Sequence, residues 1–210
     1  LPGGKIAINR GLLIHLEDES ELAAVLGHEI VHAAARHSAA QMTRGTLIGA
    51  GAQILAISLA DNEYSQLANT AIQIGSAAWM ARYGRSAELE SDAYGMEYMS
   101  RAGYDPQGAV KLQQTFVKLR EGKRTDFISG LFASHPPSRD RVQANLEKAS
   151  TLPPGERFEK RYLSKISQIK RDQPAYAAQE EGIKALKKKD PTAAIKHLDR
   201  AIQIQPAEGY

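Results

Sequence analysis

The five residues from His28 to His32 constrain this chain more than any other feature, because they read His-Glu-Ile-Val-His. Side chains four residues apart lie one above the other on an α-helix, so His28 and His32 can reach one metal ion if this segment is helical. Glu29 lies about 100° further around the same helix. It can stand beside the ion without ligating it and take a proton from water that the metal has made more acidic. The pattern predicts a hydrolytic zinc site on a helix.

The flanking residues predict that helix. Asp18 or Ser20 can cap its start, and the acidic residues Glu19 and Glu21 in the first turn favour the helix dipole. Apolar residues then continue the helical spacing through the motif at Leu22, Val25, Leu26, Ile30 and Val31. Two histidines on a helix are also compatible with a purely structural role, but a glutamate between them favours the metal site.

A catalytic zinc ion needs a third protein ligand, and the chain contains no cysteine to supply one. Glu88 is the best candidate. Ser86 can cap a helix there, which places Glu88 and Asp92 one turn apart on the same face. Asp92 would then accept a hydrogen bond from the free N–H of a ligating histidine, whereas Glu90 points to another face and is expected to be solvated. Spacing alone leaves open that these acids form a surface face.

With both motifs located, the chain resembles the HtpX/BepA-like zinc metallopeptidases, relatives of the type I CAAX prenyl endopeptidase. In that family a His-Glu-x-x-His helix is followed tens of residues later by a Glu-x-x-x-Asp helix, which here is the segment 88–92. The resemblance covers roughly the first 150 residues. It includes the glycine-rich opening segment 1–13 and the His-Pro segment 134–142, in which an arginine follows the histidine by six residues.

The resemblance implies a role for each residue of the site. It assigns one zinc ion per chain to His28, His32 and Glu88, with Glu29 as general base and Asp92 as the residue that orients a ligating histidine.

The resemblance also covers two residues near its C-terminal end. His135 matches a histidine that approaches the metal and restrains activity, and Arg141 matches an arginine near the active site. The residues alone leave two other interpretations open: His135 as a loop histidine beside Pro136-Pro137, and Arg141 as a salt-bridged or solvated helix residue.

We therefore expect a mainly α fold with a small β-sheet or hairpin: a zincin-like metallopeptidase domain followed by a helical-repeat segment. Ile6 and Ile8 alternate with more polar residues, which predicts a short strand over residues 5–9. An edge strand beside the zinc helix could bind an extended substrate by strand addition; the alternative is a small sheet that only covers the core.

Between the two metal motifs, residues 45–60 are apolar but fall short of the roughly 20 residues needed to cross a bilayer. We expect a buried helix, packed beside a second helix over residues 64–80. The alternative is a helix that dips into a membrane surface, which would give the protein peripheral membrane contact.

Other candidate residues carry weaker signals. His37 would be rotated away from His28 if the zinc helix continued, so we leave it out of the site. Tyr83 can donate to the oxyanion of a tetrahedral intermediate or simply pack as an aromatic. His15 and His197 are expected at the surface or in satisfied structural positions.

The composition changes after Ser150. We predict a metallopeptidase domain over residues 1–150, a linker and connecting helix over 151–174, and a tetratricopeptide-like helix pair over 175–210. The repeat is indicated by small, apolar and terminal-proline positions at Gly182, Ala194, Leu198, Ala201 and Pro206. Asp190-Pro191 is expected to start the second helix of the pair. One repeat cannot bury its apolar face alone, so either it docks on the first domain or further repeats follow.

The net charge of +3 comes largely from lysines in the C-terminal third, and no nucleic-acid motif accompanies them, so we predict no nucleic-acid role. No signal peptide is visible, and the first residue is not methionine, so we expect upstream sequence to have been removed. The resemblance implies a location in the periplasm or cell envelope.

Together these observations predict a zinc-dependent endopeptidase that hydrolyses peptide bonds in unfolded or misassembled cell-envelope proteins, as in protein quality control. Its partners would be polypeptide substrates, and proteins bound through the C-terminal repeat. The alternative is a chaperone or scaffold whose zinc site is restrained by His135 and whose repeat segment binds partners.

Overall fold

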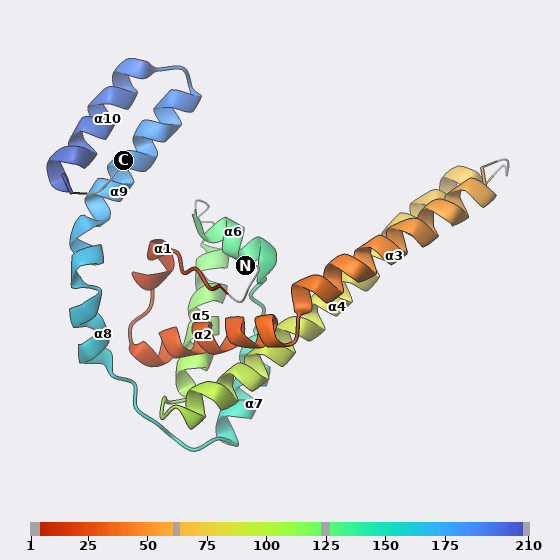
Figure 1. Cartoon of the computed structure of the whole chain (residues 1–210), viewed down its shortest axis with the longest axis horizontal. Coiled ribbons are helices and arrows are strands. Elements are labelled where there is room, and N and C mark those ends of the chain that lie inside the picture. Colours follow the sequence, from red (N-terminus) through yellow and green to blue (C-terminus); the bar gives the residue numbers. More distant parts are fainter. Residues whose placement is uncertain (1–4, 61–63, 123–126, 208–210) are drawn as a thin grey trace.

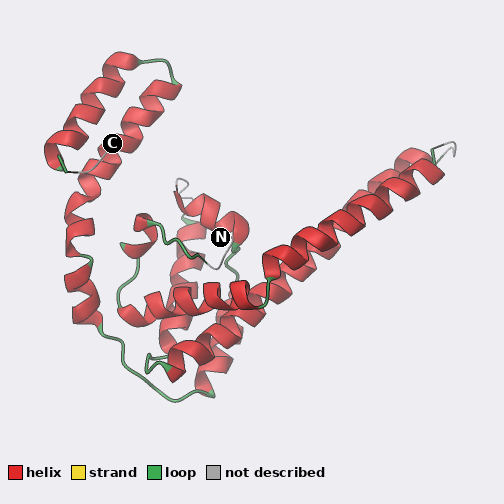
Figure 2. Cartoon of the chain, in the orientation of Figure 1, coloured by secondary structure: helices red, strands yellow, loops and turns green. Residues whose placement is uncertain are grey.

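The structure is a computed structural model of the 210-residue chain, and it describes residues 5–60, 64–122 and 127–207. Helices make up its regular structure (Figure 2). In chain order they are α1 (Arg10–Leu13), α2 (Glu19–Ala34), α3 (His37–Ser58), α4 (Ser65–Arg101), α5 (Gln107–Glu121), α6 (Phe127–Ser134), α7 (Arg139–Ser150), α8 (Glu159–Lys165), α9 (Ser167–Lys187) and α10 (Pro191–Ile204). The prediction of a mainly α fold is confirmed.

Helix α2 carries the His-Glu-Ile-Val-His motif and begins where the sequence predicts. Asp18 is its N-cap, and the Asp18 side chain accepts a hydrogen bond from the backbone N–H of Glu21 at 2.9 Å. The helix does not continue toward Ser38. It ends at Ala34, because Arg36 adopts a left-handed backbone conformation with φ of 54°. This change of direction starts α3 at His37 and turns that residue back toward α2.

The core lies where α2 crosses α4 and α5, with α7 packed on the same two helices. Its largest buried apolar side chains are Leu12, Leu16, Met96, Met99, Val110, Leu112, Phe116, Tyr162 and Ile166. The crossing of α2 and α4 is a backbone contact, because a Cβ atom on Gly27 would lie 2.6 Å from the carbonyl oxygen of Gly95. Glycine at both positions lets the two motif-bearing helices approach closely enough to share one site.

Helix α4 has 37 residues, so the expected separation into a helix over 64–80 and a second helix capped by Ser86 is wrong. Ser86 lies inside α4. Between residues 80 and 86, the only residue that disfavours a helix is Gly84, and one glycine inside a helix costs only about 1 kcal/mol relative to alanine. Packing against α2, α3 and α7 along its length offsets that cost.

Residues 45–60, which include the C-terminal part of α3, and residues 64–81, which include the N-terminal part of α4, lie side by side and project away from the other helices (Figure 1). We call this pair the arm. The prediction that residues 45–60 are buried is wrong, because Leu47, Ile54 and Ile57 are 67%, 65% and 68% exposed. The physical reason is that α3 packs along one side on α4, and none of the other described helices covers the pair. Within the described residues, no helix is both long and apolar enough to cross a membrane.

The strand predicted over residues 5–9 is not formed. These residues lie in an extended loop that has no neighbouring strand, and the only bridge in the described part of the chain pairs Tyr104 with Glu156. Without a partner, alternation of Ile6 and Ile8 cannot produce a sheet; Ile8 instead packs on the helical core. Residues 1–4, the start of the glycine-rich opening segment, lie outside the described residues.

The C-terminal segment leaves the core through residues 151–158 and forms α8, α9 and α10. Before α8, the backbone carbonyl of Arg157 accepts hydrogen bonds from the N–H groups of Glu19 and Ser20, at the start of α2. Helices α9 and α10 pack as a hairpin (Figure 1), and the predicted start of α10 is confirmed: Asp190 is the N-cap and Pro191 the first helical residue. Helix α9 starts at Ser167 and continues through Pro174, so it includes the end of the segment 151–174 that the sequence assigned to a linker and connecting helix.

Inside that hairpin the small residues are the buried ones. Ala175, Ala194 and Ala201 are fully buried, and a Cβ atom on Gly182 would lie 2.8 Å from the side chain of Leu198. Close packing through small residues agrees with the pattern from which the tetratricopeptide-like pair is predicted, and that assignment stays a prediction.

Candidate metal centre

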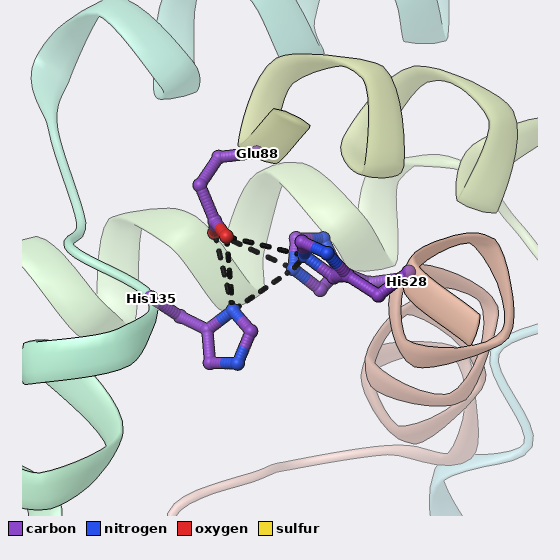
Figure 3. Close-up of side chains that lie close together, drawn as sticks. His28, Glu88 and His135 are labelled. Atoms are coloured by element: carbon purple, nitrogen blue, oxygen red, sulfur yellow. Dashed lines mark hydrogen bonds and ion pairs between the residues drawn. The ribbon is translucent and has the colours of Figure 1, made fainter. Parts of the chain in front are cut away.

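Helices α2 and α4 bring the three predicted ligands together. The Nε2 atoms of His28 and His32 lie 2.9 Å apart, as expected for residues one turn apart on α2. Glu88 of α4 reaches both rings: Oε2 is 3.4 Å from Nε2 of His28, and Oε1 is 3.1 Å from Nε2 of His32. His28 and Glu88 are buried, and Figure 3 shows the Glu88 carboxylate pointing at the His28 ring.

His135, which follows α6, adds a fourth donor. Its Nδ1 atom lies 3.1 Å from Oε1 of Glu88 and 3.3 Å from Nε2 of His28 (Figure 3). One donor atom from each of His28, His32, Glu88 and His135 lies within 4.8 Å of all the others. Bonds of about 2.1 Å to a tetrahedral zinc ion place the ligand atoms about 3.4 Å apart. The spacing of this cluster, and its three nitrogens and one carboxylate, therefore fit a zinc ion.

The charges in the cluster favour a cation. Burial would raise the pKa of Glu88, but hydrogen bonds with His135, His28 and His32 lower this pKa far below its usual value. Burial would likewise lower the pKa of His28, yet its hydrogen bonds with Asp92 and Glu88 raise the pKa to about 9. The carboxylates thus hold positive charge at this point, either as protons on the histidines or as a metal ion.

Asp92 and Arg141 form the layer behind the ligands. Asp92 Oδ1 lies 2.9 Å from Nδ1 of His28, on the side of the ring opposite the cluster, and Arg141 donates two hydrogen bonds of 2.7 Å to the Asp92 carboxylate. Arg141 Nη1 also lies 2.8 Å from Oε2 of Glu88. The three side chains are buried, so Arg141 neutralises two acids and fixes the orientation of His28 through Asp92.

Glu29 lies at the edge of this cluster and keeps partial access to solvent. Its Oε1 atom is 3.6 Å from Nε2 of His135. The carboxylate therefore stands beside the donors and not among them, which is the position that a general base requires.

An apolar pocket opens next to the cluster of donor side chains. Its empty volume is about 470 Å³, including space open to solvent, and it is bordered by His28, Glu29, His135 and Arg141. The apolar wall consists of Leu12, Ala24, Val25, Met96, Ala109, Leu112, Phe116 and Leu131. An apolar substrate side chain could occupy this pocket while its backbone lies over the cluster.

His37 belongs to the site although the sequence interpretation left it out. Its Nδ1 atom is 2.9 Å from Nδ1 of His32, its Nε2 atom is 3.5 Å from Oε2 of Glu90, and the residue is only 7% exposed. The expectation failed because it assumed one continuous helix, whereas the left-handed turn at Arg36 swings His37 back over His32. Glu90, expected to be solvated, is half exposed and faces His37.

The remaining candidates contribute nothing to the cluster. His15 and His197 are not among its members. The side chain of Tyr83, the candidate oxyanion donor, lies outside the described residues.

Comparison with known proteins agrees with this geometry. The sequence profile described as "Peptidase family M48" matches residues 1–149. The "Mitochondrial metalloendopeptidase OMA1" of Arabidopsis thaliana is 34% identical over 72% of this chain and 30% of its own length. The "Metalloprotease YcaL" of Escherichia coli K12 is 34% identical over 68% of this chain and 54% of its own. The "Beta-barrel assembly-enhancing protease" of Escherichia coli K12 is 27% identical over 72% of this chain and 32% of its own.

The chain thus spans between about a third and about half of the length of these relatives. No solved structure matches it significantly.

Proposed function

The chain belongs to peptidase family M48, and we propose that it is a zinc-dependent endopeptidase that hydrolyses peptide bonds in unfolded or misassembled proteins of the cell envelope. The observation that carries this proposal is the convergence of four metal donors, with the Glu29 carboxylate beside them, at the mouth of an apolar pocket. The relatives named as metalloendopeptidase and metalloprotease support the reaction type.

His28, His32 and Glu88 would hold the ion, and zinc bound there supplies Lewis-acid chemistry that polarises a carbonyl group and makes water more acidic. Glu29 takes the proton from the attacking water and returns it to the leaving amine. The pair Arg141–Asp92 keeps Nδ1 of His28 protonated, which directs Nε2 toward the cluster.

The decisive experiment compares the zinc-loaded chain with a Glu29→Gln variant that is shown by metal analysis to retain zinc. We expect the wild-type chain to cleave an unfolded model protein and the variant to lose at least about 100-fold in rate, because it lacks the general base. Equal cleavage by both chains would overturn the assignment of Glu29, and the zinc content guards against a lost metal as the cause.

A second candidate function is supported by His135. Its ring occupies the fourth position of the cluster, where a substrate carbonyl or water would otherwise bind. In this alternative the protein is a chaperone or scaffold with a restrained metal site. A His135→Ala variant should then cleave unfolded protein faster than the wild type, and unchanged cleavage would argue against such restraint.

Location and partners complete the proposal. We infer a periplasmic or envelope location, supported by the relative named for β-barrel assembly, together with contact at a membrane surface. The α9–α10 hairpin is proposed as a tetratricopeptide-like unit that recruits partner proteins or substrates, as the C-terminal part of a chain whose residues 1–150 form the peptidase domain and 151–174 the connection.

A further inference from the structure

The arm formed by α3 and α4 has almost no charge along its length. The sequence carries no Asp, Glu, Lys or Arg between Arg44 and Asp61, and none between Glu63 and Arg82. A solvated helix hairpin on a soluble domain normally carries charged residues on its outer face. The composition of the arm therefore differs from that of the α9–α10 hairpin, whose outer positions include many lysines.

The arm also differs from a water-soluble helix hairpin in which side chains lie between its helices and which lie on its outside. Its half-buried positions are mostly small or polar: Gly45, Ile48, Gly51, Ala52, Ala56 and Leu59 on α3, and Ser65, Ala68, Asn69, Ile72, Ser76 and Met80 on α4. Its large apolar side chains point outward instead, with Leu67 and Ile74 70% and 65% exposed. Small residues between helices and large apolar residues outside are the arrangement of helix pairs in lipid, where no hydrophobic force drives helices together.

The outward apolar side chains form stripes. Leu47, Ile54 and Ile57 recur at helical spacing along α3, and Leu67, Ala71, Ile74 and Ala78 do so along α4. Each stripe covers about three turns, and residues 45–58 of α3 extend over about 21 Å of helix. This length is shorter than the roughly 30 Å of a bilayer's hydrocarbon core, so the arm suits one leaflet and its interface rather than a crossing.

Basic and aromatic residues gather at the base of the arm. Arg44, Arg82 and Arg85 are exposed there, and the guanidinium carbon of Arg44 lies 5.9 Å from the ring centre of Trp79. Arginine and tryptophan are the residues that hold proteins at the level of lipid headgroups, where arginine pairs with phosphate and tryptophan spans the polar and apolar layers. The base therefore complements an anionic bilayer surface.

We propose that the arm docks this protein onto a lipid bilayer with anionic headgroups, with its apolar stripes in the acyl region and the arginines at its base among the phosphates. Helix α4 continues from the arm directly to Glu88, which follows Trp79 by nine residues, or about 14 Å along the axis. Docking thus holds the metal cluster close to the membrane surface. The inference needs neither bound zinc nor proteolysis, so it stands or falls separately from the proposed peptidase activity, and it gives the proposed membrane contact its site.

The full chain carries its own probe, because Trp79 is its only tryptophan. Vesicles of phosphatidylethanolamine and phosphatidylglycerol are titrated into the chain, and binding is followed by flotation and by Trp79 fluorescence. We expect the chain to float with these vesicles, a shift of Trp79 emission to shorter wavelength, and quenching by lipids brominated on their acyl chains. Vesicles of phosphatidylcholine alone should bind more weakly, because they lack net negative charge.

Three substitutions test the stripe: Leu47→Gln, Ile54→Gln and Ile57→Gln in one chain. A matched control, Leu186→Gln with Ile195→Gln and Ile202→Gln, changes apolar residues of α9 and α10 that are also exposed. Because all six side chains are exposed, both triple variants should fold. We expect vesicle affinity to fall about tenfold or more in the arm variant and to stay unchanged in the control.

Three outcomes would overturn the proposal. The first is the absence of flotation and of any Trp79 shift with anionic vesicles. The second is equal vesicle binding by the wild type and the arm variant. The third is association of the chain in sedimentation that the arm variant abolishes while vesicle binding is absent, which would assign the arm to a second copy. A Glu29→Gln chain should bind vesicles as the wild type does.

Discussion

The Nδ1 atom of His37 lies 2.9 Å from the Nδ1 atom of His32. His32 is one of the four candidate metal donors, and His37, which is not a donor itself, holds the His32 ring in place. If Nε2 of His32 faces the ion, its Nδ1–H donates to His37. His37 must then be neutral with its proton on Nε2, which faces the Glu90 carboxylate at 3.5 Å. Burial and the neighbouring His32 lower the pKa of His37, which agrees with a neutral ring.

This contact predicts that His37 positions His32 for metal binding. A His37→Phe variant should bind zinc about 10- to 100-fold more weakly, the usual effect of losing such a partner. His37→Asn should retain most of the affinity, because its side-chain oxygen can accept where Nδ1 did. Competition with a chelating dye measures both, with His197→Phe as a control far from the cluster. Wild-type affinity in the Phe variant would refute the role.

Arg141 should contribute far more to the free energy of unfolding than Arg139, which lies on the same helix. Arg141 neutralises the buried acids Asp92 and Glu88, whereas Arg139 pairs with Glu121 where both are exposed. In urea unfolding of the metal-free chain, Arg141→Met should cost about 3 kcal/mol, because it leaves buried charge unpaired. Arg139→Met should change stability by less than about 0.5 kcal/mol. Similar losses in the two variants would contradict this account of the site.

The glycine contact between α2 and α4 gives a third prediction. A Cβ atom on Gly95 would lie 2.8 Å from the backbone nitrogen of His28, so Gly95→Ala must push the helices apart. We expect a loss of about 2 kcal/mol in stability and weaker zinc binding, as His28 moves away from Glu88. Gly84→Ala on the same helix meets no atom within 4 Å and should stabilise the chain by up to about 1 kcal/mol.

The outcome that counts against this interpretation is a Gly95→Ala chain with unchanged zinc affinity. Calorimetric unfolding and dye competition on the same two variants separate an effect on stability from one on the metal site.

Glu21 predicts how stability depends on pH. Burial, with help from the nearby charge of Asp18, raises the pKa of Glu21 from 4.5 to about 7. Since the folded state holds this proton more tightly, stability from Glu21 is fully present below pH 4.5 and is lost as pH rises through 7. The total loss is at most about 3 kcal/mol. Glu21→Gln should remove that slope.

Urea unfolding of the metal-free chain at a series of pH values tests this. The stability of Glu21→Gln relative to the wild type should increase between about pH 5 and pH 8. Glu17→Gln is the control, because Lys111 lowers the pKa of Glu17 and any slope should run the other way. A constant difference between Glu21→Gln and wild type would show that Glu21 titrates normally.

Sequence patterns were reliable where one helix decides the geometry. The Asp18 and Asp190 caps lie where predicted, because a cap depends on residues within one turn. The prediction for His37 was wrong, because one left-handed residue, Arg36, redirects the chain. The prediction of a helix start at Ser86 was wrong, because tertiary packing lets α4 continue through this residue. The prediction that the arm is buried was wrong for another reason: apolar composition predicts burial, but not which medium covers the side chains.

By itself, the sequence determined that His28 and His32 share a helix face, since residues four apart meet whenever the segment is helical. Only the tertiary structure decided that Glu88, His135 and Arg141, which lie 60, 107 and 113 residues from His28, converge on that face. Their convergence depends on the close backbone crossing at Gly27 and Gly95 and on the packing of α7 over α4. Such contacts are set by the shapes of whole helices, and no local spacing encodes them.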